Sequence, residues 1–395
     1  MLSVKEAQNK VLDFDYKPEK GRLDISKALG FVFSDNIFSP ADMPAEDIAA
    51  LDGYALRAVD IKGADRNYPI RLKVYRKETS DVLEPFIEPG FCTPIFEGAP
   101  IPRGCDCVVP REATESGKKD ILIYDEYESN QNIVQRGEDV KKGKMIFPSG
   151  RRIYPKDIGI LGQMGIYDIE VYLPPRVAIV TVYPKSTPRP AKPDSRGLML
   201  SGLLTATGAG CRSYSVRYED GKAVKAKIAK IKEGCDFLAI TGSKFIGEYA
   251  FLNDVMLEMD LELGFWKVNQ DPGRNLAFLT GNNKAVFCIG GNLTMLLICF
   301  EVYLRPLLLK MMQRKDLFSN KVNARAVEHI RNKRGKTSLV TVCLEKKQGV
   351  YYFKPLACGM LSSIKSADGI AFISEDTIGL QPGEVAEVLK FDKNM

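Results

Sequence analysis

The chain has 395 residues, of which 45% are hydrophobic and 27% are charged, and its formal net charge at pH 7 is +6. This length exceeds what one ordinary hydrophobic core fills, so we expect roughly two to four domains of a globular protein. The basic excess is small and spread along the chain, which argues against nucleic acid as a partner and mildly favours small anions.

Nine cysteines show no C-x-x-C spacing and partly lie in apolar stretches, which is typical of reduced thiols in a reducing compartment. The N-terminus has no basic region followed by an apolar core, so no secretory signal is expected. The most apolar segment, 293–309, is interrupted by Glu301 and Arg305. It is too short and too charged to span a bilayer and predicts a buried helix instead. We therefore expect a cytoplasmic protein with no membrane partner.

The N-terminal third begins with Val4, Ala7 and Val11, which are spaced as on one face of a helix. From residue 28 to 140 the helical spacing disappears, and short alternating runs such as 70–75 stand between Pro and Gly breaks. This pattern predicts a β subdomain over 28–140. A helix is expected again at 155–164, so 1–27 plus 141–175 form an N-terminal linker and helical subdomain.

Residues 176–312 alternate between strands and helices. The run 176–182 is nearly continuous in β-branched residues, as in a strand buried on both faces. Further strands are predicted at 213–218, 237–241 and 285–289, with helices at 198–207, 222–233, 248–261 and 293–312. This alternation predicts βαβ units and a mostly parallel sheet. From 316 to 395 the pattern is β again, so the fold class is α/β plus β with a C-terminal β domain.

Ligands of an open parallel sheet bind beyond the carboxyl ends of its strands. The loops expected there are 183–194, 242–248, 271–275 and 290–294. Glycines at the start of two of these loops would allow close approach of an anion to backbone N–H groups. Alternatively, they are strand-to-helix turns that merely need glycine.

Three acidic positions could hold a hard cation or orient an oxyanion: Asp52, the pair Glu138–Asp139 and the pair 219–220. Solvated turns are the alternative for each. His329 is the only histidine, so any catalytic triad or His-rich zinc site would have to use it. Its basic and acidic surroundings favour an ordinary surface residue.

Seven strings, in this order along nearly the whole chain, resemble the molybdopterin molybdenumtransferase family, which includes the C-terminal E domain of gephyrin. They are MPAEDIAALDGYAL at 43–56, FEGAPIPRGCDCVV at 96–109, QNIVQRGEDVKKG at 131–143, DPGRNLAF at 271–278, IGGNL at 289–293, FEVYLRP at 300–306 and GMLSSIKSADG at 359–369. The resemblance implies an elongated protomer with an N-terminal β subdomain, a molybdopterin-binding-like α/β domain over 176–312 and a β-barrel-like domain over 316–395.

The resemblance also implies a cytoplasmic homodimer whose active site combines parts of two chains. The reaction implied by the resemblance is the insertion of molybdate into adenylylated molybdopterin with the help of Mg²⁺. Other molybdenum-cofactor biosynthesis proteins are implied as partners. At matching positions, the implied catalytic and metal-binding residues are Asp52, Glu138 and Asp139. The implied cofactor-binding residues are Gly242, Ser243, Gly247, Gly273, Arg274, Asn292, Ser362 and Ser363.

The chain departs from the family pattern at three charged positions. Lys185 and Ala250 stand where the family has acidic residues, and Asp271 stands where it has lysine. These exchanges keep a second hypothesis open, a non-catalytic or repurposed paralogue that binds a pterin, another anion or a protein partner. The two hypotheses differ in whether Glu97, Glu219, Asp220 or Glu248 rebuilds the acidic set near Asp52. The pattern does not distinguish molybdate from tungstate.

Overall fold

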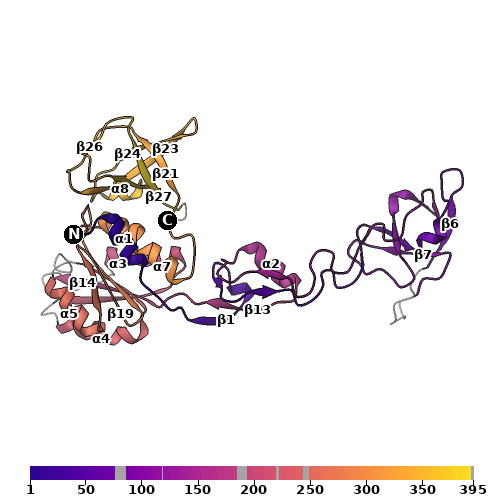
Figure 1. Cartoon of the computed structure of the whole chain (residues 1–395), viewed down its shortest axis with the longest axis horizontal. Helices are drawn as coiled ribbons and strands as arrows, with labels where there is room; N and C mark the ends of the chain where they lie inside the picture. The colour runs from indigo at the N-terminus through magenta and orange to yellow at the C-terminus, as the bar shows by residue number, and fades with distance from the viewer. Residues whose placement is uncertain (76–85, 118, 185–193, 219–221, 243–248, 393–395) are drawn as a thin grey trace. The chain divides into compact units, whose positions relative to one another are not determined.

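The computed structural model describes residues 1–395 except 76–85, 118, 185–193, 219–221, 243–248 and 393–395 (Figure 1). The chain forms two compact units. The larger unit contains Met1–Ser34, Gly150–Pro155 and Asp168–Met395, and the smaller unit contains Asp35–Ser149 and Lys156–Tyr167. The smaller unit therefore interrupts the chain of the larger one.

The smaller unit is mainly β, as the alternating runs predict. Its main sheet has the order β8-β5-β7-β6-β10-β9 and encloses a core that includes Leu56, Leu72 and Ile121. These strands are β5 (Gly53–Leu56), β6 (Ile70–Val74), β7 (Phe91–Ile95), β8 (Cys107–Pro110), β9 (Thr114–Ser116) and β10 (Asp120–Ile123). Two short antiparallel pairs complete the smaller unit. They are β4 (Ile48–Ala49) with β11 (Ile133–Val134), and β3 (Ile37–Phe38) with β12 (Met145–Phe147). The predicted helix is α2 (Pro155–Gln163).

The larger unit is built around a six-stranded sheet of order β15-β14-β16-β20-β19-β17. The first four strands are parallel, which confirms the predicted mostly parallel sheet: β15 (Cys211–Tyr218), β14 (Val177–Pro184), β16 (Phe237–Gly242) and β20 (Lys284–Gly290). Strand β19 (Leu276–Gly281) is antiparallel to both of its neighbours, β20 and the edge strand β17 (Glu262–Trp266), and the sequence analysis predicted neither β19 nor β17. The signal for β19 is Asn282–Asn283, both with positive φ, which form the two-residue turn of the hairpin between β19 and β20.

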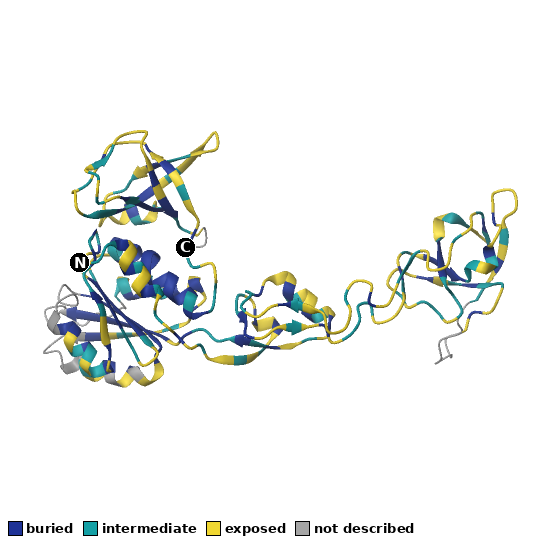
Figure 2. Ribbon diagram, in the orientation of Figure 1, coloured by how far each residue is buried: buried dark blue, intermediate teal, exposed yellow. Residues whose placement is uncertain are grey.

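Helices cover both faces of this sheet, and Figure 2 shows its strands buried between them. One core contains residues of α1 (Val4–Leu12), α3 (Ser195–Thr207), α6 (Leu293–Cys299), the π-helix η6 (Phe300–Leu304) and α7 (Arg305–Met311). The other contains residues of α4 (Lys222–Ile231) and α5 (Tyr249–Met259). The segment 293–311 is almost wholly buried, which confirms the predicted buried helix.

The C-terminal part of the larger unit is a closed barrel, as expected. The barrel has the spatial strand order β23-β24-β21-β27-β25, and β25 also pairs with β23, which closes it. Their bounds are β21 (Lys321–Ala326), β23 (Thr337–Lys347), β24 (Val350–Pro355), β25 (Gly369–Ile373) and β27 (Val385–Lys390). Strand β18 (Gln270–Asp271) joins β23, the pair β22 (Ile330–Arg331) with β26 (Gly379–Leu380) lies apart, and α8 (Leu361–Lys365) precedes β25.

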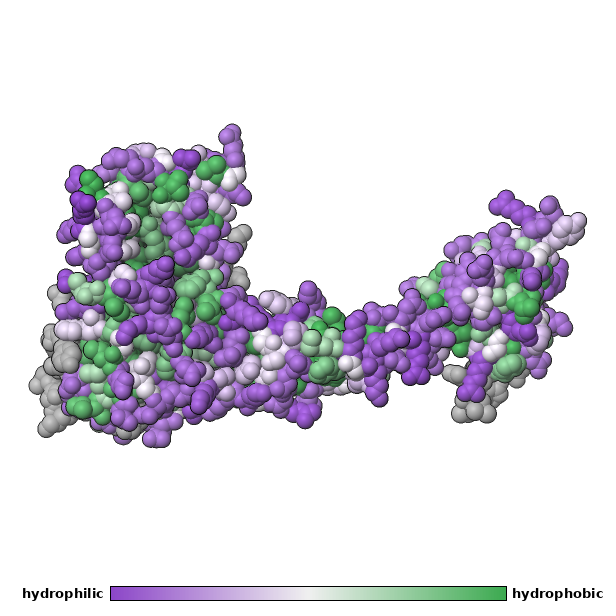
Figure 3. Space-filling model, in the orientation of Figure 1, coloured by the Kyte–Doolittle hydropathy of each residue, from purple (hydrophilic) through white to green (hydrophobic). Residues whose placement is uncertain are grey.

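Three short strands, β1 (Lys20–Asp24), β13 (Asp168–Tyr172) and β2 (Val32–Phe33), form a separate antiparallel sheet of the larger unit. Short 3₁₀ turns occur at η1 (Ile25–Lys27), η2 (Ala58–Ile61), η3 (Arg111–Ala113) and η4 (Lys232–Gly234). Polar residues cover most of the face shown in Figure 3. Among the described residues, no helix combines the length and the apolar character needed to cross a membrane.

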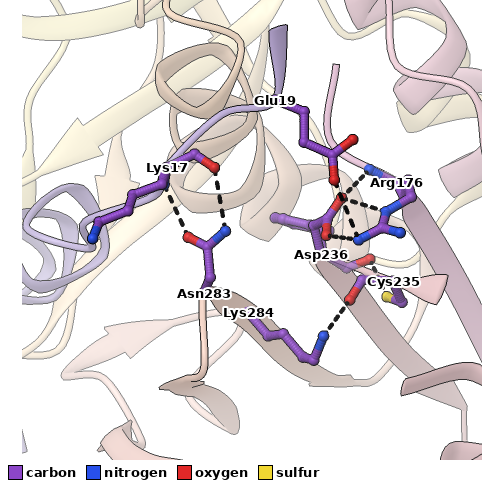
Figure 4. A network of polar contacts seen from close by, with 8 residues as sticks. Lys17, Glu19, Arg176, Cys235, Asp236, Asn283 and Lys284 are labelled. Atoms are coloured by element: carbon purple, nitrogen blue, oxygen red, sulfur yellow. Dashed lines mark hydrogen bonds and ion pairs between the residues drawn. The ribbon is translucent and has the colours of Figure 1, made fainter. Parts of the chain in front are cut away.

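A polar network ties the N-terminal segment to the amino-terminal edge of the sheet (Figure 4). Arg176 donates to both carboxylate oxygens of Asp236, at 3.0 Å from Nε and 2.7 Å from Nη2, and Glu19 lies 3.9 Å from the same guanidinium. Asn283 of the hairpin exchanges hydrogen bonds with the backbone of Lys17. The hydrogen bonds from Arg176 keep the pKa of Asp236 below its usual range despite its burial.

Candidate functional site

The candidate site lies at the edge of the sheet where β14, β16 and β20 end. The strand register places Gly242, the last residue of β16, between Val182 of β14 and Gly290, the last residue of β20. The loops that follow β16 and β20 therefore begin side by side, as expected for adjacent parallel strands. This is the edge at which open α/β sheets bind their ligands.

An arginine-carboxylate pair that the sequence analysis missed lies at the same edge. Nε and Nη2 of Arg196 donate to the two carboxylate oxygens of Asp194 at 2.8 and 2.9 Å, and Nη1 donates to the carbonyl of Gly242 at 2.7 Å. The hydrogen bonds from Arg196 lower the pKa of Asp194. Asp194 is also the N-cap of α3. An aspartate shortly before a helical run is a capping signal that could have found Asp194, although not its pairing with Arg196.

The first turn of helix α3 packs very closely on β14 at this edge. A Cβ added at Gly197 would lie only 2.7 Å from Oγ1 of Thr181. Real side chains do not tolerate such an approach, so the first turn of α3 requires glycine here. The close packing fixes where Asp194 and Arg196 stand relative to the end of β14.

Asn292, a predicted cofactor-binding residue, caps the helix after β20. Its Oδ1 accepts from the backbone N–H of Met295 at 3.0 Å. Thr294, two residues further along, contacts the C-terminal barrel region: the N–H of Gly359 donates to its Oγ1 at 3.1 Å. A Cβ at Gly359 would lie 3.1 Å from Nδ2 of Asn292. The structure thus brings the start of α6 and the loop before α8 together.

Ser362 and Ser363 lie in α8, a few residues beyond Gly359. Ser362 is exposed, whereas Ser363 retains only 7% of its surface. The two serines therefore differ in access to a ligand, and Ser362 is the one that offers its side chain to solvent.

Gly273 and Arg274 belong to the loop that follows β18. Gly273 has φ +91°, and a Cβ there would meet Nε2 of Gln270 at 2.6 Å and Sγ of Cys299 at 3.0 Å. Gln270 is buried and accepts a hydrogen bond from the hydroxyl of Tyr303. The loop is therefore held against the buried helix α6–η6, and its Arg274 is exposed.

Several predicted residues fall where the structure makes no statement. Ser243 and Gly247 lie outside the described residues, as do Lys185, Glu219, Asp220 and Glu248. Ala250 lies in α5, but its side chain is not described. The roles of these residues stay predictions.

The predicted acidic residues Asp52, Glu138 and Asp139 lie in the smaller unit, and all three are exposed. Oδ1 of Asp52 accepts from the N–H of Glu97 at 2.8 Å, and Oε2 of Glu138 accepts from the N–H of Gln135 at 2.8 Å. The structure thus places Glu97 beside Asp52, and the other three proposed replacement acids lie outside the described residues. Over the described part of the chain, no group of three or more His, Cys, Asp or Glu residues could hold a metal ion.

The arrangement at the sheet edge is suited to an anionic small molecule. Two glycine-ended parallel strands meet there, a capped helix start follows, and loop residues Arg274 and Ser362 are exposed. The larger unit is thus an open α/β sheet with an attached β barrel, and this sheet edge is its candidate ligand site.

Comparison with known proteins identifies the family. Residues 2–165 match the model of the MoeA N-terminal region (domain I and II), and residues 323–391 match that of the MoeA C-terminal region (domain IV). The crystal structure of a molybdopterin biosynthesis moeA protein from Pyrococcus horikoshii superimposes with a TM-score of 0.83 at 27% identity, over 99% of both chains. The chain belongs to the MoeA family.

Two curated relatives match over nearly their full lengths. Molybdopterin molybdenumtransferase 2 of Mycobacterium tuberculosis is 26% identical, with 98% of this chain and 99% of the relative covered. Molybdopterin molybdenumtransferase of Bacillus subtilis is also 26% identical, with 98% of this chain and 94% of the relative covered.

Proposed function

We propose that the chain is a molybdopterin molybdenumtransferase of molybdenum cofactor biosynthesis, which inserts molybdate into adenylylated molybdopterin. The observation that carries this proposal is the convergence at the sheet edge. There the ends of β16 and β20 adjoin, and the loop at Gly359 meets the Asn292 cap. Whole-length similarity to relatives that bear this enzyme name supports it.

In this proposal the sheet edge binds the phosphate-bearing part of the pterin. Arg274 supplies positive charge, and the hydroxyl of Ser362 supplies a donor to a phosphate oxygen. The Arg196–Asp194 pair is a positioning element. Arg196 already donates hydrogen bonds to Asp194 and to the carbonyl of Gly242, the last residue of β16. Gly273 allows the Arg274 loop to sit against the core.

Asp52, Glu138 and Asp139 are proposed to act at the molybdate end of the reaction. Two of these carboxylates already accept a backbone N–H, and the described residues contain no three-ligand acidic group. The described residues of one chain therefore form no resident Mg²⁺ site, and the proposal assigns no step to that ion. A homodimer that supplies the acidic residues from a second chain, and a cytoplasmic location, are part of the proposal.

Calorimetry tests the proposal directly. Adenylylated molybdopterin is titrated into the purified protein with and without molybdate, and AMP release is followed. We expect tight binding and molybdate-dependent AMP release that Asp52→Ala abolishes. Asp125→Ala, which removes another exposed carboxylate of the smaller unit, is the matched control.

The other outcomes identify the competing hypothesis. Binding without AMP release would favour a carrier or repurposed paralogue, and the exposed Asp271, in place of the family lysine, is the observation that favours it. Absence of binding would contradict the transferase hypothesis and leave a repurposed paralogue with a different ligand. A stable monomer at micromolar concentration would contradict a site composed from two chains.

A further inference from the structure

A cavity of about 440 Å³ in the larger unit is lined by three arginines, Arg152, Arg305 and Arg314. It also contacts Thr207, the last residue of α3. Because α3 has 13 residues and begins at the carboxyl edge of the sheet, its end lies about 20 Å from that edge. The arginine cavity is therefore separate from the proposed pterin site.

The polar groups of this cavity are buried without complete partners. Arg305 and Ser319 each retain 7% of their surface. Nε of Arg305, Nε of Arg152 and Oγ of Ser319 have no hydrogen-bond partner in the part of the chain that the structure describes. A buried polar atom left without a hydrogen-bond partner destabilises the fold, so folded proteins rarely retain several together unless something else satisfies them.

The charge of the cavity favours an anion. Asp316 accepts from Nε of Arg314 at 3.0 Å and lies 3.8 Å from Nη1 of Arg152, and Asp392 pairs with Nη2 of Arg305. Three guanidinium groups thus face two carboxylates. Each guanidinium has five N–H donors in a planar fork, so donors remain after these pairs form.

A second cavity, of about 220 Å³, adjoins the first. The two share four lining residues, among them Arg152, Thr207 and Arg314. The remaining walls of the second cavity are mostly apolar or aromatic and include Leu29, Phe31, Val32, Tyr172, Pro174 and Met312. A ligand with its anionic end at the arginines would place an uncharged body there.

We propose that the joined cavities bind a small phosphorylated compound, with the phosphoryl group among Arg152, Arg305 and Arg314 and an apolar or aromatic body against Phe31 and Tyr172. The free Nε groups and the Ser319 hydroxyl donate to the phosphoryl oxygens. The combined space lies in the range of pockets for small organic molecules and is larger than a bare oxyanion needs. This site is independent of the proposed transferase reaction.

Phenyl phosphate and inorganic phosphate are the probes, and calorimetry on the full chain is the measurement. We expect phenyl phosphate to bind with a Kd below about 1 mM and at least tenfold more tightly than inorganic phosphate. Arg152→Gln should weaken phenyl phosphate at least tenfold, since it removes one cation and one free donor. Arg22→Gln, which removes an exposed arginine of β1, should leave the affinity unchanged.

Ser319→Ala guards against a folding artefact, because it removes only a hydroxyl. It should weaken phenyl phosphate severalfold while the unfolding temperature without ligand stays the same or rises. No binding of phenyl phosphate at 10 mM would overturn the proposal, as would equal losses from Arg152→Gln and Arg22→Gln. Equal affinities for the two probes would overturn the role assigned to the apolar cavity.

Discussion

Glu301 provides a test of how burial sets protonation in this fold. It lies in the π-helix η6 with 1% of its surface exposed, and neither carboxylate oxygen has a hydrogen-bond partner among the described residues. Burial raises the pKa of Glu301 to about 7, Arg305 opposes that rise, and Asp392 adds to it. Below about pH 7 the protonated carboxyl is therefore the form that the folded chain favours.

The sign and size of the effect follow from linkage. Because the folded pKa is higher than the ordinary value of 4.5, Glu301 costs nothing below pH 4.5. It destabilises the fold progressively as pH rises through about 7. At 1.36 kcal/mol per pH unit the full cost is about 3 kcal/mol, with about 2 kcal/mol already present at pH 6. Glu301→Gln has the same shape without the charge, so it should gain stability over the wild type as pH rises.

Urea unfolding at pH 5, 6 and 8 measures this difference, with fluorescence of Trp266 in β17 as the probe. Trp266 is the only tryptophan and lies in the sheet of the larger unit, so the signal reports that unit. We expect Glu301→Gln to exceed the wild type by about 1 kcal/mol at pH 5 and by about 3 kcal/mol at pH 8. A difference that is the same at all three pH values would refute the reasoning. The exposed Glu262→Gln is the control and should show no trend.

Three further outcomes are expected. Asp236→Asn should lower the free energy of unfolding by about 1–2 kcal/mol, a value limited by the half-exposed Arg176, in the same urea assay. Gly273→Ala should cost about 1–3 kcal/mol, because its Cβ would lie 2.6 Å from a buried side-chain nitrogen at φ +91°. Of the nine cysteines, the exposed Cys343 and Cys358 should react first with an aromatic disulfide reagent, and Cys358 faster because a hydrogen-bonded carboxylate raises the pKa of Cys343.

Matched changes separate these effects from general damage. Asp168→Asn removes an exposed carboxylate of the same unit and should leave stability unchanged. Gly335→Ala shares a positive φ but meets no atom within 4 Å, so the excess cost at Gly273 isolates the steric contact. Equal costs at the two glycines, or fast reaction of the buried Cys288, would contradict the packing described above.

The parts of the fold that sequence predicts are those with a strong local signal. The parallel strands β14, β16 and β20 are continuous apolar runs, and the segment 293–311 is apolar for longer than a strand needs. Strands β17 and β19 were missed because their residues lack strict alternation, although Asn282–Asn283 marks the turn between β19 and β20. Local pattern therefore predicts elements better than it predicts their pairing.

The candidate site also has a part that local sequence patterns predict and a part that they do not. Glycine-rich loops after parallel strands were predictable because strand direction fixes the edge at which they meet. The Arg196–Asp194 pair was missed because nothing in the sequence shows that an arginine in the first turn of a helix reaches the carbonyl of Gly242. The arginine cavity draws on residues from 152 to 392, and separations of that size leave no local signal.

The path of the chain through the larger unit also bears on how it folds. Gln8 of α1 donates to the carbonyl of Val302 at 3.2 Å, across 294 positions of sequence, and Lys310 of α7 donates to the carbonyl of Leu12. During synthesis, α1 therefore leaves the ribosome long before its packing partners exist. The inserted segment 35–149 contains its own core and can collapse first. Docking of α1 is thus a late, long-range step, and slow folding is the expected consequence of so large a loop closure.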